Sequence, residues 1–150
     1  MKLKVHSIRL RAFSHKNEVN HVKQAIYNIL PDEFKEKQIK ESEVEPESDA
    51  GIFIESLKVL EISLNKQADI KTFISNLLEK LKKSDKEKLF NEISNRIDEE
   101  CNFYIRLSKK DAMNKKFIME SNDSIQIKIK IAAFPKNKNT AIEILKGLLK

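Results

Sequence analysis

The stretch Ile125-Gln126-Ile127-Lys128-Ile129-Lys130-Ile131 decides how this chain folds, because every second residue is apolar and the residues between them are polar. Such alternation is typical of a strand that buries one face and exposes the other. The stretch Phe103-Tyr104-Ile105-Arg106-Leu107-Ser108-Lys109 alternates in the same way. We therefore predict two strands that share a buried apolar face and an open polar face.

Weaker patterns predict further strands on both sides of this pair. Residues 3–13 alternate with a one-residue slip near His6-Ser7, which indicates a β-bulge. Residues 52–64 are strongly apolar and predict a long, bulged strand. Residues 39–45 could form a short edge strand, and residues 117–119 could add another.

Apolar residues at helical spacing predict four helices, over 17–30, 70–81, 84–97 and 140–149. Pro31 ends the first, because proline lacks a backbone donor and disfavours helix at the residue before it. Ser84 with Glu87, and Thr140 with Glu143, have the spacing of capping boxes at the third and fourth helices. The second and third helices are expected to form a helical hairpin.

The predicted order is β-α-β-α-α-β-β-α, which indicates an α+β fold with two layers: a mainly antiparallel or mixed sheet with helices packed on one face. A chain of 150 residues with 40% hydrophobic and 35% charged residues fits a single globular domain over 1–150. No apolar run approaches the ~18 residues of a membrane span, and the N-terminus lacks a signal-type apolar core. We expect a soluble cytoplasmic protein without membrane contact.

Several site classes are excluded or weakened by composition. Cys101 is the only cysteine, so an internal disulfide or a multi-cysteine metal site is excluded. The two glycines leave nothing for a phosphate-cradling loop, so P-loop and Rossmann sites are excluded too. His6, His15 and His21 lack the i,i+3 or i,i+4 spacing of helical metal ligands, although they could meet in space. We expect neither a metal nor a cofactor.

The net charge of +6 is concentrated in the two ends of the chain. Residues 1–31 hold six Lys/Arg against one Glu, and residues 101–150 hold eleven against four acidic residues. Residues 32–50 are acidic, with three Lys against eight acidic residues. If the fold brings the two ends together in one sheet, they form a basic surface for an acidic partner.

The polar face of the predicted sheet is where such a partner would bind. Cations on alternate strand residues can follow a phosphate backbone, and an exposed tyrosine can stack on a base. The candidate RNA-binding residues are those of the strands and of the loop between the two clearest strands: Arg9, Arg11, Tyr104, Arg106, Lys128 and Lys130, with Lys109, Lys110, Lys115 and Lys116. Lysines on a solvent-facing sheet are also ordinary solubility devices, so the pattern alone leaves both interpretations open.

A second cluster, Asp98-Glu99-Glu100 beside Cys101, combines carboxylates with a thiol. Adjacent side chains diverge in direction, and an acidic run at a helix end is usually solvated. A hydrolase using Asp98–Glu100 is therefore the weakest hypothesis, and we expect the carboxylates to point into solvent. Cys101 precedes a strand and is expected to be a small buried apolar residue.

Three segments carry a family resemblance: 5–15 (Val-His-Ser-Ile-Arg-Leu-Arg-Ala-Phe-Ser-His), 96–109 (Arg-Ile-Asp-Glu-Glu-Cys-Asn-Phe-Tyr-Ile-Arg-Leu-Ser-Lys) and 128–135 (Lys-Ile-Lys-Ile-Ala-Ala-Phe-Pro). They resemble a small archaeal family catalogued as RNA-binding proteins or predicted exosome subunits, formerly a domain of unknown function. The resemblance implies a fold similar to the ribosomal protein that binds 5S rRNA, an intracellular archaeal setting, and no catalytic residues. The family has a Gly-Asn-Pro turn before the middle strand, where this chain has Asp49-Ala50-Gly51.

The leading hypothesis is a non-enzymatic RNA-binding protein, an accessory of RNA processing or of an exosome. It assigns Arg9, Arg11, Arg106, Lys128 and Lys130 to the phosphate backbone and Tyr104 to stacking. The alternative is a protein-interaction or assembly module, a homodimer or a subunit, that uses the same sheet face or the exposed edge of the strand 52–64.

Overall fold

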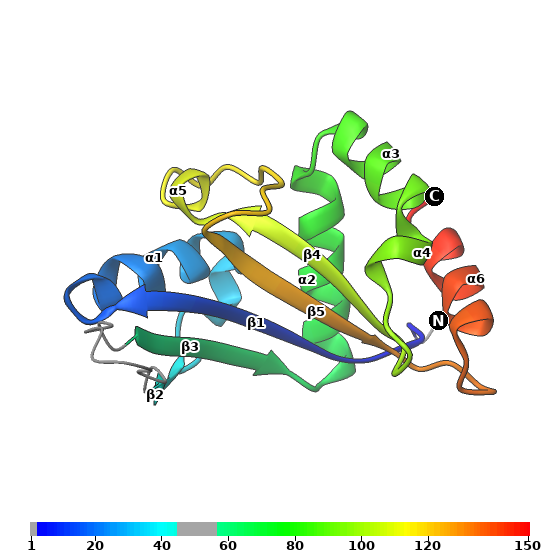
Figure 1. Cartoon of the computed structure of the whole chain (residues 1–150), viewed down its shortest axis with the longest axis horizontal. Helices are drawn as coiled ribbons and strands as arrows, with labels where there is room; N and C mark the ends of the chain where they lie inside the picture. Colours follow the sequence, from blue (N-terminus) through cyan, green and yellow to red (C-terminus); the bar gives the residue numbers. More distant parts are fainter. Residues whose placement is uncertain (1–2, 45–56) are drawn as a thin grey trace, which may run out of the picture.

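A computed structural model describes residues 3–44 and 57–150 of the chain. Within these residues one sheet runs in the order β2-β3-β1-β5-β4, and every neighbouring pair is antiparallel. Figure 1 shows the helices gathered on one side of this sheet. The two-layer α+β prediction is confirmed, with an antiparallel sheet. The strands are β1 (Val5–His15), β2 (Lys40–Val44), β3 (Leu57–Leu64), β4 (Asn102–Ser108) and β5 (Ser124–Ile131).

The helices follow the predicted order, with two differences. The helix predicted over 84–97 is observed as two, Lys83–Asn91 and Ile93–Arg96, which meet at Glu92. The short helix α5 occupies a segment that was predicted to be part of a loop, between β4 and β5. The helices are α1 (Val19–Ile29), α2 (Gln67–Lys80), α3 (Lys83–Asn91), α4 (Ile93–Arg96), α5 (Lys109–Ala112) and α6 (Lys138–Leu148), with 3-10 turns η1 (Lys16–Glu18) and η2 (Asp32–Phe34).

The pairing of β1 determines the shape of the sheet. It pairs with β3 on one side and with β5 on the other, so the first and last parts of the chain are direct neighbours. The register of β1 against β5 shifts between Val5 and Ser7, which confirms the predicted bulge. β3 lies between β2 and β1, so the predicted exposed edge at 52–64 is wrong for residues 57–61, which pair with the short strand β2. Residues 52–56 and the turn at Gly51 lie outside the described residues.

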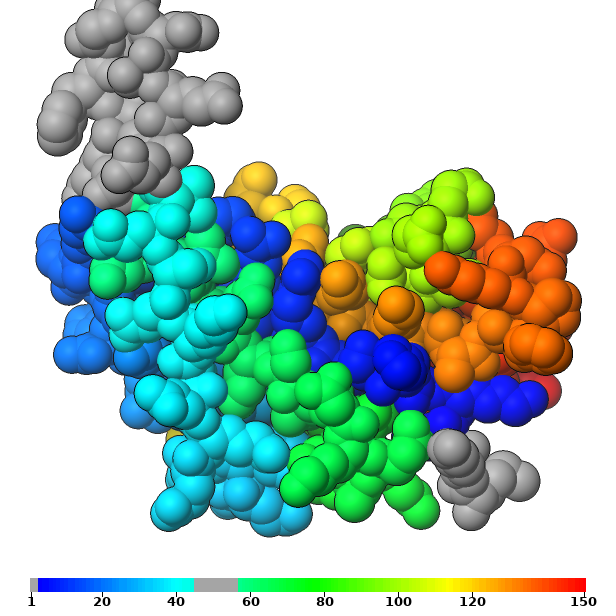
Figure 2. All heavy atoms as spheres, turned by 90° about the horizontal axis from the view of Figure 1, so that it is seen from below, coloured from blue at the N-terminus to red at the C-terminus, as the bar shows by residue number. Residues whose placement is uncertain are grey.

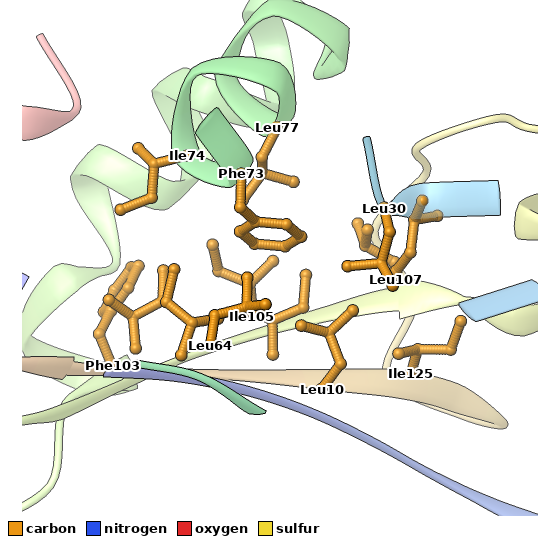
Figure 3. Close-up of a cluster of buried hydrophobic side chains, with 14 of the residues drawn as sticks. Leu10, Leu30, Leu64, Phe73, Ile74, Leu77, Phe103, Ile105, Leu107 and Ile125 are labelled. Carbon is orange, nitrogen blue, oxygen red and sulfur yellow. The ribbon is translucent and has the colours of Figure 1, made fainter. Parts of the chain in front are cut away.

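The core fills the space between the helices and the inner face of the sheet. Alternate residues of each long strand point inward, for example Leu10 of β1 and Ile105 of β4, both at most 1% exposed. Figure 3 shows Phe73 of α2 directed at these strand residues. Burial of an aromatic side chain of this size contributes roughly 2 to 3 kcal/mol. The inward face being apolar, the intervening residues must point to the other side of the sheet.

The predicted caps of two helices are wrong. The helix α3 begins at Lys83, so Ser84 lies inside its first turn, and the capping residue Lys82 makes no side-chain cap bond. The helix α6 is capped by Asn137, whose Oδ1 accepts from the backbone N–H of Thr140 at 2.8 Å. Serine and threonine suit both the cap and the first turn, so the spacing of a capping box does not define which residue begins the helix.

The segment 117–119 forms less than the predicted strand. Its pairing with β4 is an isolated bridge between Leu107 and Met119, extended by the bond from the Ser108 N–H to the Ile118 carbonyl at 2.7 Å.

In the described part of the chain, no helix combines the length and the apolar character that a membrane crossing needs.

Candidate nucleic-acid interface

The face of the sheet opposite the helices carries the predicted strand cations. Figure 2 views this face, where the blue atoms of β1 lie beside the orange atoms of β5. Arg9 of β1 is paired in register with Lys128 of β5, and Lys128 is paired with Tyr104 of β4. Lys130 lies two residues further along β5, opposite Ser7. Residues from three strands thus form one cross-strand row.

A second row lies beside the first, two residues further along each strand. Arg11 of β1 is opposite Gln126 of β5, which is opposite Arg106 of β4. On the other side of Arg11 is Glu61 of β3, with 3.4 Å between the Arg11 Nε and a Glu61 carboxylate oxygen. Glu61 is in turn opposite Lys40. The row therefore alternates cation, amide, cation, carboxylate and cation.

Burial and neighbouring cations together change the acid–base behaviour of Lys128. Partial burial of its side chain, the guanidinium of Arg9 and the ammonium of Lys130 together lower the pKa of Lys128 below its usual value. The Nε of Arg9 is buried and makes no hydrogen bond to any described residue. Like charges held together in this way are unfavourable in the free protein. A bound anion would relieve the repulsion.

Tyr104 is more constrained than the prediction supposed. Its hydroxyl donates to Oδ2 of Asp98 at 2.9 Å. Burial and this hydrogen bond to a carboxylate raise the pKa of Tyr104. The edge of the ring is therefore anchored, and only its partly exposed face is available for a ligand.

Asp98 has a structural task rather than a catalytic geometry. It accepts from the backbone N–H groups of Glu100 and Asn102, both at 2.9 Å, at a turn in which Cys101 has a φ of 64°. Burial alone would raise the pKa of Asp98, but the hydrogen bonds from Asn102, Tyr104 and Glu100 outweigh it and lower the pKa. Together these bonds hold the turn that leads into β4.

The neighbouring carboxylates do not converge on Asp98 or on the thiol. The side chains of Glu99 and Glu100 are 85% and 69% exposed, and they pair with Lys138 and Lys136. Cys101 is fully buried, as expected. The expectation that the carboxylates point into solvent is confirmed for Glu99 and Glu100 and wrong for Asp98, whose carboxylate is held by hydrogen bonds within the fold. The three carboxylates do not converge, which removes support from the hydrolase hypothesis.

The four lysines of the predicted loop are not equivalent. The Nζ of Lys109 donates to the Phe13 carbonyl at 2.6 Å and to the Asp123 carboxylate at 2.7 Å, so it joins β1 to the start of β5. Its side chain is only 16% exposed. The other three remain exposed beside the same end of the sheet: Lys110, Lys115 and Lys116. The geometry gives Lys109 a structural contact and leaves its neighbours available to a ligand.

Phe13 is a residue of this face that sequence reasoning missed. Its side chain is 47% exposed, and the Arg11 guanidinium carbon lies 5.4 Å from the centroid of its ring. The signal was present in the sequence, because position 13 continues the outward alternation of Arg9 and Arg11. The open face thus has a second aromatic residue, on the central strand.

A small pocket extends the basic character around the edge of the sheet. It has a volume of about 190 Å³ and lies where β4 meets the helices α3 and α4. Arg96 holds its place there through contacts to the Tyr104 carbonyl at 3.5 Å and to Glu92 at 3.4 Å. Its lining residues are Lys88, Arg96, Arg106, Met119, Glu120 and Ser121.

The histidines do not assemble into a metal site. Across residues 3–44 and 57–150, no three side chains of the His, Cys, Asp or Glu types come together in a way that could hold a metal ion.

A family model described as RNA binding matches residues 7–131. The chain belongs to this family. It is 30% identical over 150 residues to the RNA-binding protein PAB1135 of Pyrococcus abyssi, a match that covers 99% of this chain and 96% of the relative. The family resemblance inferred from the three sequence segments is thereby confirmed.

Solved structures of archaeal proteins share the whole fold. Protein AF2318 from Archaeoglobus fulgidus is 25% identical, with a TM-score of 0.78 over 98% of this chain and 99% of that one. Mth689 from Methanothermobacter thermautotrophicus is 22% identical, with a TM-score of 0.76 over 97% of this chain and 98% of that one. Both matches span the sheet and the helical layer together.

Proposed function

We propose that the chain is a non-catalytic RNA-binding protein that holds the phosphate backbone on the open face of its sheet. The observation that carries the proposal is the register that places Arg9 opposite Lys128 on adjacent strands. Isolated surface lysines serve solubility, whereas Lys128 is partly buried and held opposite Arg9, so the pair is costly unless an anion binds it. The family description supports RNA as that anion.

The contacts divide into two groups. Backbone phosphates are bound by the strand cations, and further phosphates by the exposed loop lysines: Arg9, Arg11, Arg106, Lys128 and Lys130, then Lys110, Lys115 and Lys116. The partly exposed ring of Tyr104 offers a limited stacking surface. Phosphate contacts position RNA without reading its sequence, so binding is expected to be weakly sequence-dependent. The role that follows is an accessory of RNA processing, with an exosome as the proposed partner complex.

A salt titration tests the proposal directly. Filter binding of a single-stranded RNA is measured for the full chain between 50 and 400 mM salt, and several phosphate contacts require a steep linear fall of log K with log salt. Replacing Arg106 and Lys128 by Glu should abolish most of that binding. Lys71→Glu, on the exposed side of α2, is the matched control for charge reversal. A flat salt response, or equal loss in the control, contradicts the proposal.

The assembly hypothesis makes a different prediction for the same face. A homodimer through the open face would bury Arg106 and Lys128, and charge reversal there would change its mass in solution. Size-exclusion chromatography with light scattering therefore separates the two roles. A stable dimer that the Glu variants disrupt, without RNA binding by the wild type, favours assembly.

A further inference from the structure

We infer that the end of the open face at Phe13 is a stacking site for an unpaired nucleobase, so that the protein selects single-stranded over double-stranded RNA. This inference rests on the proposed RNA-binding function and names the substrate class more narrowly. It concerns a residue outside the predicted site set. Phe13 is 47% exposed and lies among cations.

The backbone under the Phe13 ring is held on two sides. Phe13 is paired in register with Val59 of β3, and Val59 is 2% exposed although it lies on the open face. The Phe13 carbonyl accepts from the Lys109 ammonium at 2.6 Å, which ties this point of β1 to the short helix α5. The ring is therefore presented by a fixed backbone on a central strand, which keeps the entropy cost of stacking low.

The charges around the ring favour a base that belongs to a polyanion. The guanidinium carbon of Arg11 lies 5.4 Å from the ring centroid. Arg9 points outward from the same strand, two residues before Arg11. Glu61, opposite Arg11, already pairs with it at 3.4 Å, and Asp123, just before β5, already pairs with Lys109 at 2.7 Å. An apolar peptide would bring no anion to Arg9, whereas a nucleotide brings its phosphate to the arginines and its base to Phe13.

Strand selectivity follows from access to the base. In an RNA duplex each base is stacked and paired, so its face is closed to a side chain, and recognition is limited to the backbone and the shallow groove. An unpaired base can leave the strand and stack on an aromatic ring. Removing one such ring typically weakens binding by about 5- to 150-fold.

The test compares two RNAs and matched variants of the full chain. Affinities are measured by fluorescence anisotropy for a 12-nucleotide single strand and for a 12-base-pair RNA duplex. Phe13→Leu, which keeps an apolar side chain on the strand, should weaken single-strand binding at least 5-fold, leave duplex binding within 2-fold, and leave the salt slope unchanged. Phe13→Tyr should restore the affinity. Phe134→Ala is the control, because Phe134 is an aromatic residue at 96% exposure on another part of the surface.

The possible failures are distinguishable. If the wild type binds neither RNA with a salt-dependent affinity, the proposed function fails. If the wild type binds with a steep salt slope and Phe13→Leu loses nothing, or loses equally on both RNAs, only this inference is overturned. It is also overturned if Phe13→Leu changes the mass of the protein by light scattering without changing RNA affinity, because Phe13 then belongs to a protein interface. Thermal unfolding of each variant verifies that the comparison is made between folded chains.

Discussion

Replacing Lys128 by Met should separate binding from stability. Lys128 sits opposite Arg9 and two residues from Lys130, and both cations contribute to the lowering of its pKa. Methionine keeps most of the length and the apolar stem of the side chain but removes the charge. If a residue only supports the fold, its replacement should make the protein less stable. If a cation is kept beside other cations in order to bind a ligand, its replacement should not make the protein less stable.

The magnitude follows from the positions of the charges. With unit charges ~7 Å apart in a medium of dielectric constant ~80, each repulsive pair costs about 0.6 kcal/mol. Two such pairs cost about 1 kcal/mol, and salt and the opposing carboxylates of Asp98 and Glu61 reduce this. We expect the free energy of unfolding to stay constant or to rise by up to ~1 kcal/mol in Lys128→Met.

The affinity of Lys128→Met for RNA should fall, although its stability does not. Loss of one phosphate contact to single-stranded RNA reduces the salt slope by ~0.7, which corresponds to about fivefold in affinity at ~0.1 M salt. Urea denaturation gives the stability, and the salt-dependent binding assay gives the slope. Lys71→Met on α2 removes the same charge from the helical layer and should leave the slope unchanged. A Lys128→Met variant that loses more than about 1 kcal/mol in stability, or binds like the Lys71→Met control, refutes the reasoning.

Three further predictions concern the fold and the loop. The fold lowers the pKa of Asp98, so its carboxylate stabilises the folded chain above the unfolded pKa of ~3.9, and this stabilisation is lost as the pH falls through the folded pKa. Asp98→Asn should therefore lower the free energy of unfolding by about 1 kcal/mol in urea denaturation at pH 7, and the difference should vanish in strong acid. Phe73→Ala, in the centre of the core, should cost about 3 to 5 kcal/mol, and a loss below 1 kcal/mol would mean that the core is packed differently. Lys109→Met should lower the thermal midpoint and keep the salt slope of RNA binding, because Lys109 makes no phosphate contact. Lys110→Met should keep the midpoint and reduce the slope; equal slope losses in both would contradict the structural assignment of Lys109.

The two clearest strands and the bulge were predicted correctly, because strand periodicity is local. Alternation over 103–109 and 125–131 predicted which side chains are buried, and the slip at His6-Ser7 predicted the bulge in β1. The helix caps failed at Ser84 and Thr140, because a capping residue is defined by the path of the chain entering the helix. The short helix α5 left no periodic signal, since four residues are too few to show one.

The candidate site needed more than periodicity. Tyr104 and Lys109 both appear in the sequence as outward polar residues, yet each is held by a partner that is identified only in three dimensions: Asp98 through a hydroxyl hydrogen bond, and the Phe13 carbonyl 96 residues away. Phe13 itself alternates with Arg9 and Arg11, but its exposure depends on which residues of the neighbouring strand and helix cover it.

Taken by itself, the order of polar and apolar residues determined which face of each strand is exposed to solvent, because neighbouring residues of a strand point in opposite directions. It also determined that the cations lie on that exposed face. It could not determine which strands are neighbours, because the pairing of β1 with β5 joins segments more than a hundred residues apart. Only the folded chain places Arg9 opposite Lys128, and that proximity is the observation on which the proposed binding surface rests.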